Sequence, residues 1–584
     1  MSTPILARQV ITLCRVVADH ATHDPVVFGI QIFRRLPAGA SRVAGALLAV
    51  VPGTAAAAAA SWLTGDVSRA REYATARPAG RFQSRVLGEL ALSMGDRRTA
   101  IERAGDVAGT HGGQLLEARI RWHEGRMSDA VASAPAGRMK DRLAAELRVF
   151  QPEWEPKTSA DGAAPTPRGL PHASVLFCLT NSLPHTQSGY TLRTHAVLTA
   201  VADAGVPVMG ADRTGYPTDI GRPVLQDRVQ IDGIDYLFDI PARLGNTLDE
   251  RLEQQTSFLM RTARGSRAQA IHTTTHFTNG LVARAAAREL GLPWIYEVRG
   301  SLEDTWASSR GDENDELAAR RSERFRLFRQ RETDIARSAD AVLTLGLTMA
   351  DELAGRGVDR NRMLVAPNSV SGGLLSADWR EDPASVRESL GLPRGGVWVG
   401  TAASIVSYEG LDTLVDAVIC ARSSGVDLRV LIVGDGAELP ALKERAAKLG
   451  DAAVFTGRVL PERAQEYVLA LDIFAVPRKD VAVCRKITPL KPVEAGGLGR
   501  AVVVSDLPAL TEALPKEARK VFAAEQVEDL TRTLVALADD PDERQRLGSA
   551  ARRFVEENRT WTALGERYRR MYEDLGVPVK GGHV

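Results

Sequence analysis

The chain has 584 residues, a length that indicates roughly three to four domains. Hydrophobic residues make up 44% of the sequence and charged residues 25%, which is the composition of an ordinary globular protein. The formal net charge is only +1, so the chain has no bulk field that would attract nucleic acid or an anionic membrane. Any anion-binding site must therefore be local.

The four cysteines have no C-x-x-C spacing, so neither a disulfide nor a metal site is expected. We interpret Cys178, in a strand pattern, and Cys420, in a helical pattern, as thiols of the core. The first residues lack the pattern of a signal peptide, and a cytoplasmic location is predicted. Residues 43–63 are apolar but rich in alanine and broken at Pro52-Gly53. This predicts two packed helices rather than a membrane span, and leaves peripheral contact with the inner face of the cell membrane open.

Residues 1–150 show a helical pattern with a repeated turn. Glycine recurs in these turns every 30 residues, and an alanine follows each glycine by five residues: Gly65, Gly95 and Gly125, then Ala70, Ala100 and Ala130. Such a period is typical of stacked helical hairpins, and the region resembles a tetratricopeptide-like array. It is either a structural layer or a docking surface for a protein partner or an acceptor. Residues 151–170, rich in Pro, Gly and Ala, are predicted to be a linker.

From residue 171 apolar strands alternate with helices, which predicts a parallel, doubly wound sheet in residues 171–375. One charged helix is expected there from about Asp315 to Ala336. The alternation of strands and helices restarts after a Gly- and Ser-rich break, and a second such domain is predicted in residues 376–555. A final helical segment, residues 556–584, is expected to cross back over the first of the two domains. In such domains ligands bind beyond the carboxyl ends of the strands.

The run CRKITPLKPVEAGG places basic residues where a strand ends and a helix begins. Arg485, Lys486 and Lys491 surround Pro489, and Glu494 follows. Cations and a helix N-terminus suit phosphate charge, and a carboxylate suits sugar hydroxyls. The sequence therefore predicts a site for a nucleoside diphosphate in the second domain.

Several stretches resemble the family 4 retaining glycosyltransferases of GT-B architecture, over roughly residues 172–575. They are residues 182–219, residues 271–306, LIVGDGAELPALKERAAKLG, VFTGRV and TPLKPVEAGGLGRAVVVSD. The resemblance implies two Rossmann-like domains, an acceptor domain followed by a donor domain, behind the all-α extension. It also implies transfer of a sugar from a nucleotide-diphosphate sugar to a hydroxyl acceptor with retention, without a metal or another cofactor.

The resemblance assigns roles in the first domain. A histidine at the strand edge faces the reacting centre, and either His272 or His276 takes this role. The Ser188-Gly189 turn opens a helix whose N–H groups suit phosphate. Arg299 is expected to meet a phosphate or an acidic acceptor, or else to form a surface ion pair.

In the second domain Ser404 belongs to the donor site by the same resemblance, but Glu409 stands where the family has a lysine. We expect replacement cations among five basic residues: Arg478, Lys479, Arg485, Lys486 and Lys491. Lys486 also occupies the first position of the family's paired glutamates. Glu494 occupies the second, where it would accept hydrogen bonds from the ribose hydroxyls. Backbone amides of Thr488 and Leu490, beside Pro489, would frame the sugar or phosphate.

The predicted function is synthesis of a cell-surface polysaccharide, a teichoic-type polymer or a glycolipid. The acceptor would be a carbohydrate, a polyol phosphate or a lipid-linked molecule, and nucleic acid is not an expected partner. The replaced lysine and glutamate leave a second hypothesis open, that of a degenerate transferase acting as a helical-repeat scaffold. A sugar-nucleotide epimerase or a phosphorylase of the same fold is a third.

Overall fold

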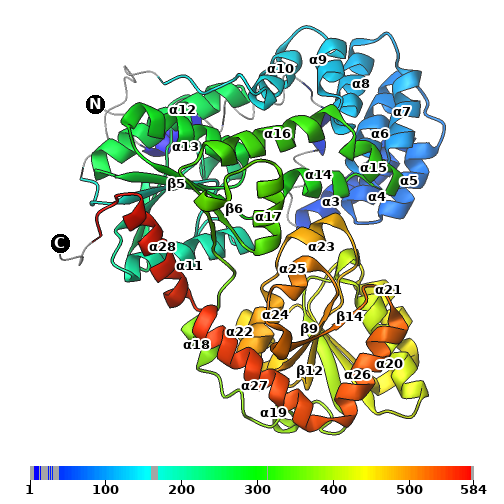
Figure 1. The fold of residues 1–584 in the computed structure, drawn as a ribbon. Helices are drawn as coiled ribbons and strands as arrows, with labels where there is room; N and C mark the ends of the chain where they lie inside the picture. Colours follow the sequence, from blue (N-terminus) through cyan, green and yellow to red (C-terminus); the bar gives the residue numbers. More distant parts are fainter. Residues whose placement is uncertain are drawn as a thin grey trace.

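The computed structural model describes residues 38–158, 169–311 and 313–579, together with short stretches between residues 5 and 30. Parts of the first 37 residues, residues 159–168 of the predicted linker, and residues 580–584 lie outside the described residues. Figure 1 shows three parts: a helical region in blue, a first α/β domain in cyan and green, and a second in yellow and orange. The predicted pair of doubly wound domains behind an all-α region is confirmed.

The helical region contains short helices joined by tight turns. Its described helices are α3 (Ala38–Ala49), α4 (Thr54–Leu63), α5 (Val67–Thr75), α6 (Arg81–Ser93), α7 (Arg97–Asp106), α8 (His111–His123), α9 (Met127–Ser133) and α10 (Arg138–Phe150). The break at Pro52-Gly53 separates α3 from α4, as predicted. The three repeated glycines have φ values of 89°, 77° and 79°, and the three alanines after them are fully buried. Each glycine therefore supplies a left-handed turn residue, and each alanine lets two helices approach closely.

The first α/β domain is built on an eight-stranded sheet of order β3-β4-β2-β1-β5-β6-β7-β8. Its strands are β1 (Val175–Leu179), β2 (Val208–Asp212), β3 (Arg228–Ile231), β4 (Ile234–Leu237), β5 (Ala270–Thr274), β6 (Trp294–Val298), β7 (Ala341–Thr344) and β8 (Met363–Val365). Its α-helices are α11 (Gly189–Asp203), α12 (Leu248–Ser266), α13 (Phe277–Leu290), α14 (Leu302–Ser308), α15 (Glu313–Arg320), α16 (Glu323–Ser338) and α17 (Leu347–Gly355). The pairings are parallel except for the β3–β4 hairpin.

The prediction of one charged helix from about Asp315 to Ala336 was wrong, because two helices occupy this stretch. Ser322 lies between α15 and α16, and its hydroxyl accepts a hydrogen bond from Phe325 N (3.3 Å). This cap begins a new helix at α16.

The second α/β domain has a six-stranded parallel sheet of order β11-β10-β9-β12-β13-β14, the order of a doubly wound dinucleotide-binding sheet. Its strands are β9 (Val397–Ala402), β10 (Leu428–Val433), β11 (Ala453–Gly457), β12 (Ile473–Val476), β13 (Ala501–Ser505) and β14 (Arg519–Phe522). Its α-helices are α19 (Pro383–Ser389), α20 (Leu411–Ser423), α21 (Leu439–Arg445), α22 (Pro461–Leu469), α23 (Ala482–Lys486), α24 (Lys491–Gly497), α25 (Pro508–Thr511), α26 (Val527–Asp539) and α27 (Pro541–Asn558), and α18 (Gly372–Leu375) joins the domains. Cys420 of α20 is exposed, so its interpretation as a core thiol was wrong, whereas Cys178 is buried.

The last helix returns to the first domain. After α27, helix α28 (Trp561–Asp574) lies beside α11, as Figure 1 shows. Tyr568 and Tyr572 are fully buried in the core of the first domain. A Cβ on Gly565 would lie 2.3 Å from Ala200 O, so only glycine permits this close approach. Among the described residues, no helix is long and apolar enough to cross a membrane.

Candidate functional site

The two α/β domains meet where their strands end. The Asn368 side chain, just after β8, donates a hydrogen bond to Thr488 O of the second domain (3.0 Å). Lys486 Nζ lies 2.6 Å from Asp304 Oδ2 and 2.9 Å from Glu352 Oε1, both in the first domain. These contacts hold the loop before α24 against the first domain, at the edge where a ligand of this fold is expected.

On the side of the first domain, a cavity of about 240 Å³, named the cleft cavity below, opens at the ends of β1, β5 and β6. Its lining includes Ser188, His276 and Arg299. Ser188 caps α11: its hydroxyl accepts a hydrogen bond from Thr191 N (3.2 Å), and its own N–H donates to Thr191 Oγ1 (2.8 Å). No atom outside the adjacent backbone lies within 4 Å of a Cβ added at Gly189. The predicted turn therefore presents a capped and unobstructed helix start to this cavity.

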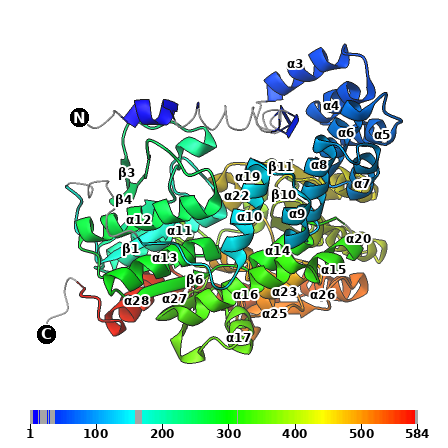
Figure 2. The ribbon, with the colours of Figure 1, turned by 90° about the horizontal axis from the view of Figure 1, so that it is seen from above.

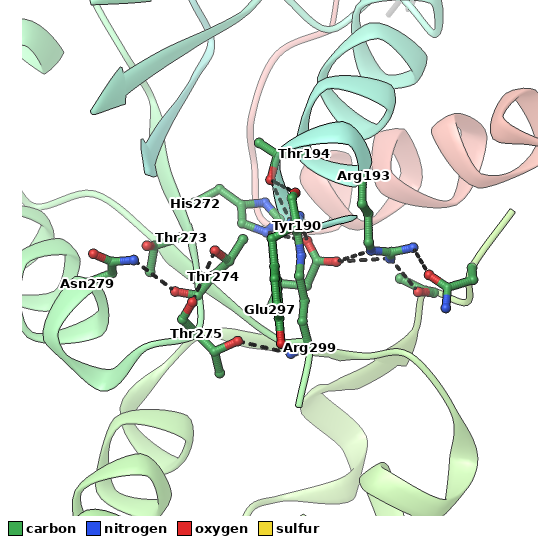
Figure 3. A network of polar contacts seen from close by, with 12 residues as sticks. Tyr190, Arg193, Thr194, His272, Thr273, Thr274, Thr275, Asn279, Glu297 and Arg299 are labelled. Carbon is green, nitrogen blue, oxygen red and sulfur yellow. Dashed lines mark hydrogen bonds and ion pairs between the residues drawn. The ribbon is translucent and has the colours of Figure 1, made fainter. Parts of the chain in front are cut away.

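Arg299 belongs to a buried network drawn in Figure 3. The Glu297 carboxylate lies 2.9 Å from one guanidinium nitrogen of Arg299 and 3.0 Å from one of Arg193. Arg299 also donates to Thr194 Oγ1 (2.6 Å), and Arg193 to Asn368 Oδ1 (3.0 Å). The alternative of a surface ion pair for Arg299 is thus wrong, while a ligand role for Arg299 stays a prediction. Arg299 forms an ion pair, but the pair is buried beside the cavity.

Two guanidiniums determine the charge state of Glu297. Burial alone would raise its pKa, but the attraction of Arg299 and Arg193 outweighs burial and holds the pKa well below its usual range. Glu297 is therefore ionised at neutral pH, and the trio carries one net positive charge. A buried positive centre at the end of β6 can attract a phosphate or an acidic acceptor.

The structure separates the two candidate histidines. The His272 ring is fully buried, stacks on Phe177 at 4.4 Å and has its Nδ1 2.6 Å from the Tyr572 hydroxyl. It is a core residue and does not line the cavity. His276 does line it, as the N-cap of α13, where Nδ1 accepts a hydrogen bond from Thr278 N (3.3 Å). Burial and the nearby Arg324 lower the pKa of His276 to about 3, so the ring is neutral and Nε2 carries the proton.

In the second domain the expected cations do not form one cluster. Arg478 and Lys491 both contact Glu409, at 3.0 Å and 2.7 Å. Burial would raise the pKa of Glu409, but Lys491 and Arg478 hold it below its usual value. The replacement of the family's lysine by Glu409 thus places a buried carboxylate between two cations, and this trio also has one net positive charge.

The other three of the five candidate cations lie elsewhere. Lys479 pairs with Asp412 at 2.7 Å, beside a cavity of about 170 Å³. Arg485 pairs with Asp480 on the surface, and Lys486 bridges to the first domain as described above. Each therefore has a carboxylate partner within the folded chain.

The remaining predicted donor residues lie in different surroundings within the second domain. Ser404 lines an open hollow of about 650 Å³ with Gly434 and Gly436. A Cβ on Gly434 would lie 1.9 Å from Ala403 O, and a Cβ on Gly436 would lie 2.1 Å from Ile405 O. Both distances are too short, so this wall of the hollow requires glycine. Thr488 is buried, and its hydroxyl lies 2.5 Å from Glu512 Oε1.

Pro489 and Leu490 join Thr488 to α24, in which Glu494 lies. Burial raises the pKa of Glu494, and Lys491 partly offsets this. Among the residues that the structure describes, none donates a hydrogen bond to the Glu494 carboxylate. Its oxygens are therefore available to a ligand's hydroxyl groups.

Sequence reasoning missed Arg193 and Asn368, which connect Glu297 to the second domain. The signal for Arg193 was a lone arginine, one helical turn after Gly189, in the run TLRTHAVLTAV, whose other residues except His195 are apolar or small. Asn368 had no such signal, because its role depends on the approach of the second domain. In the described part of the chain, no group of three or more His, Cys, Asp or Glu side chains is placed to hold a metal ion.

Comparison with known proteins identifies both α/β domains. Residues 188–369 match the glycosyl transferase 4-like domain, and residues 395–540 match the glycosyl transferases group 1. A GDP-mannose-dependent monoacylated alpha-(1-6)-phosphatidylinositol monomannoside mannosyltransferase of Corynebacterium glutamicum is 28% identical over 189 residues, 32% of this chain and 50% of the relative. A 2-deoxystreptamine glucosyltransferase of Streptomyces kanamyceticus is 29% identical over 213 residues, 35% of this chain and 53% of the relative. The chain thus spans about half the length of the curated relatives it matches.

Solved structures agree on the fold. A sucrose-phosphate synthase from Thermosynechococcus elongatus superimposes with a TM-score of 0.53 at 18% identity, over 69% of this chain and 99% of that one. The Anabaena protein HepE in complex with UDP gives 0.52 at 14% identity, over 69% of this chain and 100% of that one. The two matched segments fall in the two α/β domains, so the chain is similar to a glycosyl transferase 4-like domain followed by a glycosyl transferases group 1 domain, arranged in a GT-B fold.

Proposed function

We propose that the protein transfers a sugar from a nucleoside-diphosphate sugar to a hydroxyl acceptor, with retention of configuration and without a metal. The observation that carries this proposal is a pair of buried trios, one beyond the strand ends of each sheet. Arg193, Glu297 and Arg299 form one, and Arg478, Glu409 and Lys491 the other, each with one net positive charge. Two fixed positive centres at the ends of two sheets suit a departing diphosphate.

The donor would lie across the second domain. Glu494 would bind the ribose hydroxyls, and the Arg478–Lys491 pair the diphosphate. The transferred sugar would face His276, whose protonated Nε2 can donate a hydrogen bond to it. In the reaction, the bond from the anomeric carbon to the phosphate oxygen breaks, the acceptor oxygen bonds to the same face of that carbon, and the hydroxyl proton passes to the phosphate.

The relatives guide the choice of donor. One relative is named as GDP-mannose-dependent, and one solved neighbour carries UDP, so GDP- and UDP-sugars are the first candidates. The acceptor would be a carbohydrate, a polyol phosphate or a lipid-linked sugar, and the setting the cytoplasm or the inner face of the membrane.

The test is a panel of GDP-, UDP- and ADP-sugars offered to the full chain, with nucleotide release and calorimetric binding as readouts. Binding of one nucleotide in the micromolar range, with slow release in the absence of an acceptor, is expected. Lack of binding across the panel would instead favour the scaffold hypothesis. That alternative has one observation in its support, since every predicted phosphate-binding cation already has a carboxylate partner.

A further inference from the structure

A second cavity, of about 790 Å³, lies between the helical region and the first α/β domain. Helices α8 and α10 form one wall, and α14, the turn after it and α16 form the other. Figures 1 and 2 both place α10 close to α16. None of the residues discussed above as donor ligands lines this cavity.

The cavity walls are joined by the third glycine turn of the helical region. Arg324 N donates a hydrogen bond to Gly125 O (2.9 Å), and Ser128 N donates to a Glu323 carboxylate oxygen (2.7 Å). A Cβ on Gly125 would lie 2.4 Å from Ser322 Oγ, so the two walls are in direct contact at this turn. The cavity is therefore a fixed feature of the docked chain.

The charges that line the cavity are mainly positive. Five arginines but only two carboxylates border it: Arg119, Arg138, Arg142, Arg310, Arg324, Asp24 and Glu146. Within the described part of the chain, the Arg310 side chain forms no ion pair and donates only to Trp306 O (3.2 Å) and Ser309 Oγ (2.9 Å). Arg324 lies 3.9 Å from Glu146, and its Nε is buried without a hydrogen-bond partner. These two guanidiniums keep donor capacity for an anion.

Two tryptophans supply flat apolar surface in this cavity, and the two guanidiniums lie over part of it. The guanidinium of Arg324 lies 5.9 Å from the ring centre of Trp122 and 5.3 Å from that of Trp306, and the guanidinium of Arg310 lies 5.2 Å from Trp306. Indole faces pack well against a flat, mainly C–H surface such as one face of a sugar ring. Arginine beside tryptophan thus favours a ligand that is both anionic and carbohydrate-like.

This cavity is a close neighbour of the cleft cavity described above. Leu302 of α14 lines the cleft cavity and Trp306 of the same helix lines this one, a rise of about 6 Å along the helix. Arg324 lines this cavity, and its charge contributes to the low pKa of His276 in the cleft. A molecule of several sugar units is long enough to occupy both.

We propose that this cavity binds an anionic carbohydrate, with its phosphate or carboxylate against Arg310 and Arg324 and a sugar ring against Trp122 and Trp306. Resting on the function proposed above, we assign this ligand as part of the acceptor, held while its terminal hydroxyl reaches the cleft. The helical region then serves the transferase by completing an acceptor site.

The test uses the full chain and three probes: glucose 6-phosphate, glucose and inorganic phosphate, with binding followed by calorimetry. Glucose 6-phosphate is expected to bind at least tenfold more tightly than either of the others, because only it meets both the charge and the ring surface. Arg310→Gln should weaken this binding about tenfold, since a charge-assisted hydrogen bond is lost. Arg310→Lys, which keeps the charge, should restore most of it and also serves if Arg310→Gln does not fold.

Arg380→Gln is the matched control, because Arg380 also lies over a tryptophan, Trp379, at 5.0 Å, but outside the cavity. It should leave the binding of glucose 6-phosphate unchanged. Three outcomes would overturn the proposal. The first is equal binding of inorganic phosphate and glucose 6-phosphate, and the second is no binding of glucose 6-phosphate up to about 20 mM, the limit for a weak site. The third is an equal loss of binding in Arg310→Gln and Arg380→Gln.

Nucleotide binding, measured on the same samples, separates this inference from the proposed function. Wild type and Arg310→Gln should bind the preferred nucleotide equally. Glucose 6-phosphate binding without any nucleotide binding would refute the transferase while leaving the cavity assignment intact. Nucleotide binding without glucose 6-phosphate binding would refute the cavity assignment and leave the proposed transferase intact.

Discussion

Arginines and lysines gather in two regions of the protein, and the regions differ in what faces their charges. At the domain boundary each cation is met by a carboxylate: Glu297 lies between Arg193 and Arg299, and Glu409 between Arg478 and Lys491. In the cavity of the helical region, Arg310 forms no ion pair with any described residue. Several basic residues close together in sequence therefore do not identify an anion site by themselves. The position of the carboxylates decides which cations retain donor capacity for a ligand.

The difference also has consequences for stability. A buried carboxylate between two guanidiniums offsets charges that would be costly to bury alone. A cation that borders an open cavity keeps part of its hydration and costs less when it has no partner. The first region should therefore be sensitive to loss of its carboxylates, and the second should tolerate loss of its arginines but lose its ligand.

The largest effect is expected for Glu297→Gln. This change leaves Arg193 and Arg299 buried without a counter-charge, and we expect a loss of about 3–5 kcal/mol in the free energy of unfolding. Urea denaturation measures it, with Arg310→Gln as the comparison, which should lose less than about 1 kcal/mol because its site is open. Similar losses in the two variants would remove the distinction between the two regions.

The next effect concerns the turn that holds the cavity together. Gly125→Ala introduces a Cβ at a φ of 79° and 2.4 Å from Ser322 Oγ, whereas Gly65→Ala, at a φ of 89°, meets no atom within 4 Å. Both variants carry the backbone strain of about 1–2 kcal/mol, but only Gly125→Ala adds about 1–3 kcal/mol of overpacking. Thermal denaturation of the pair measures the difference. An equal decrease in Tm would mean that the helical region is not docked through this turn.

A smaller effect is expected on nucleotide affinity. Glu494→Ala should weaken binding of the preferred nucleotide by about 10- to 100-fold, the value of a charge-assisted hydrogen bond to the ribose. Glu409→Ala should not weaken it, because Arg478 and Lys491 are then released toward the phosphates. Calorimetric titration compares the two. Equal losses of affinity would show that the donor pocket lies elsewhere.

The smallest effect is a pH dependence that arises in the cavity. Burial, then Arg310 and Arg97, lower the pKa of His123 to about 4, against a weaker opposing effect of Asp315. Between pH 6.5 and pH 4 the unfolded chain therefore binds a proton that the folded chain does not, and stability falls as the pH falls through this window. With allowance for partial exposure of the ring, we expect His123→Gln to remove about 1 kcal/mol of this loss between pH 7 and pH 5. Identical pH profiles for variant and wild type would contradict this assignment of His123.

Much of the architecture could be predicted from the sequence because it depends on local patterns. The alternation of apolar strands with helices predicted both sheets, and the spacing of Gly65, Gly95 and Gly125 predicted the helical turns. The β3–β4 hairpin was missed although its signal was present. Asp232-Gly233, with φ values of 47° and 81°, forms a two-residue turn that favours such a hairpin.

The candidate site could be predicted only in part. Ser188, His276 and Arg299 were predicted for one site and do line one cavity, while His272, four residues before His276, is enclosed in the core. Strand β5 ends between the two histidines. A side chain within the strand lies in the core, whereas one just beyond its end reaches the cleft cavity. Their roles as ligands or catalytic residues remain predictions.

The sequence by itself determined the order of the domains, the helical region with its period of 30 residues, and the residue types available at each strand end. These depend on periodicity and turn chemistry, which act over a few neighbouring residues. Only the tertiary structure decided which charges meet. Lys486 reaches Asp304 across 182 positions, and Arg324 enters a cavity whose other wall comes from α8 and α10. Charge pairing depends on distances between elements far apart in the chain, and no local pattern encodes them.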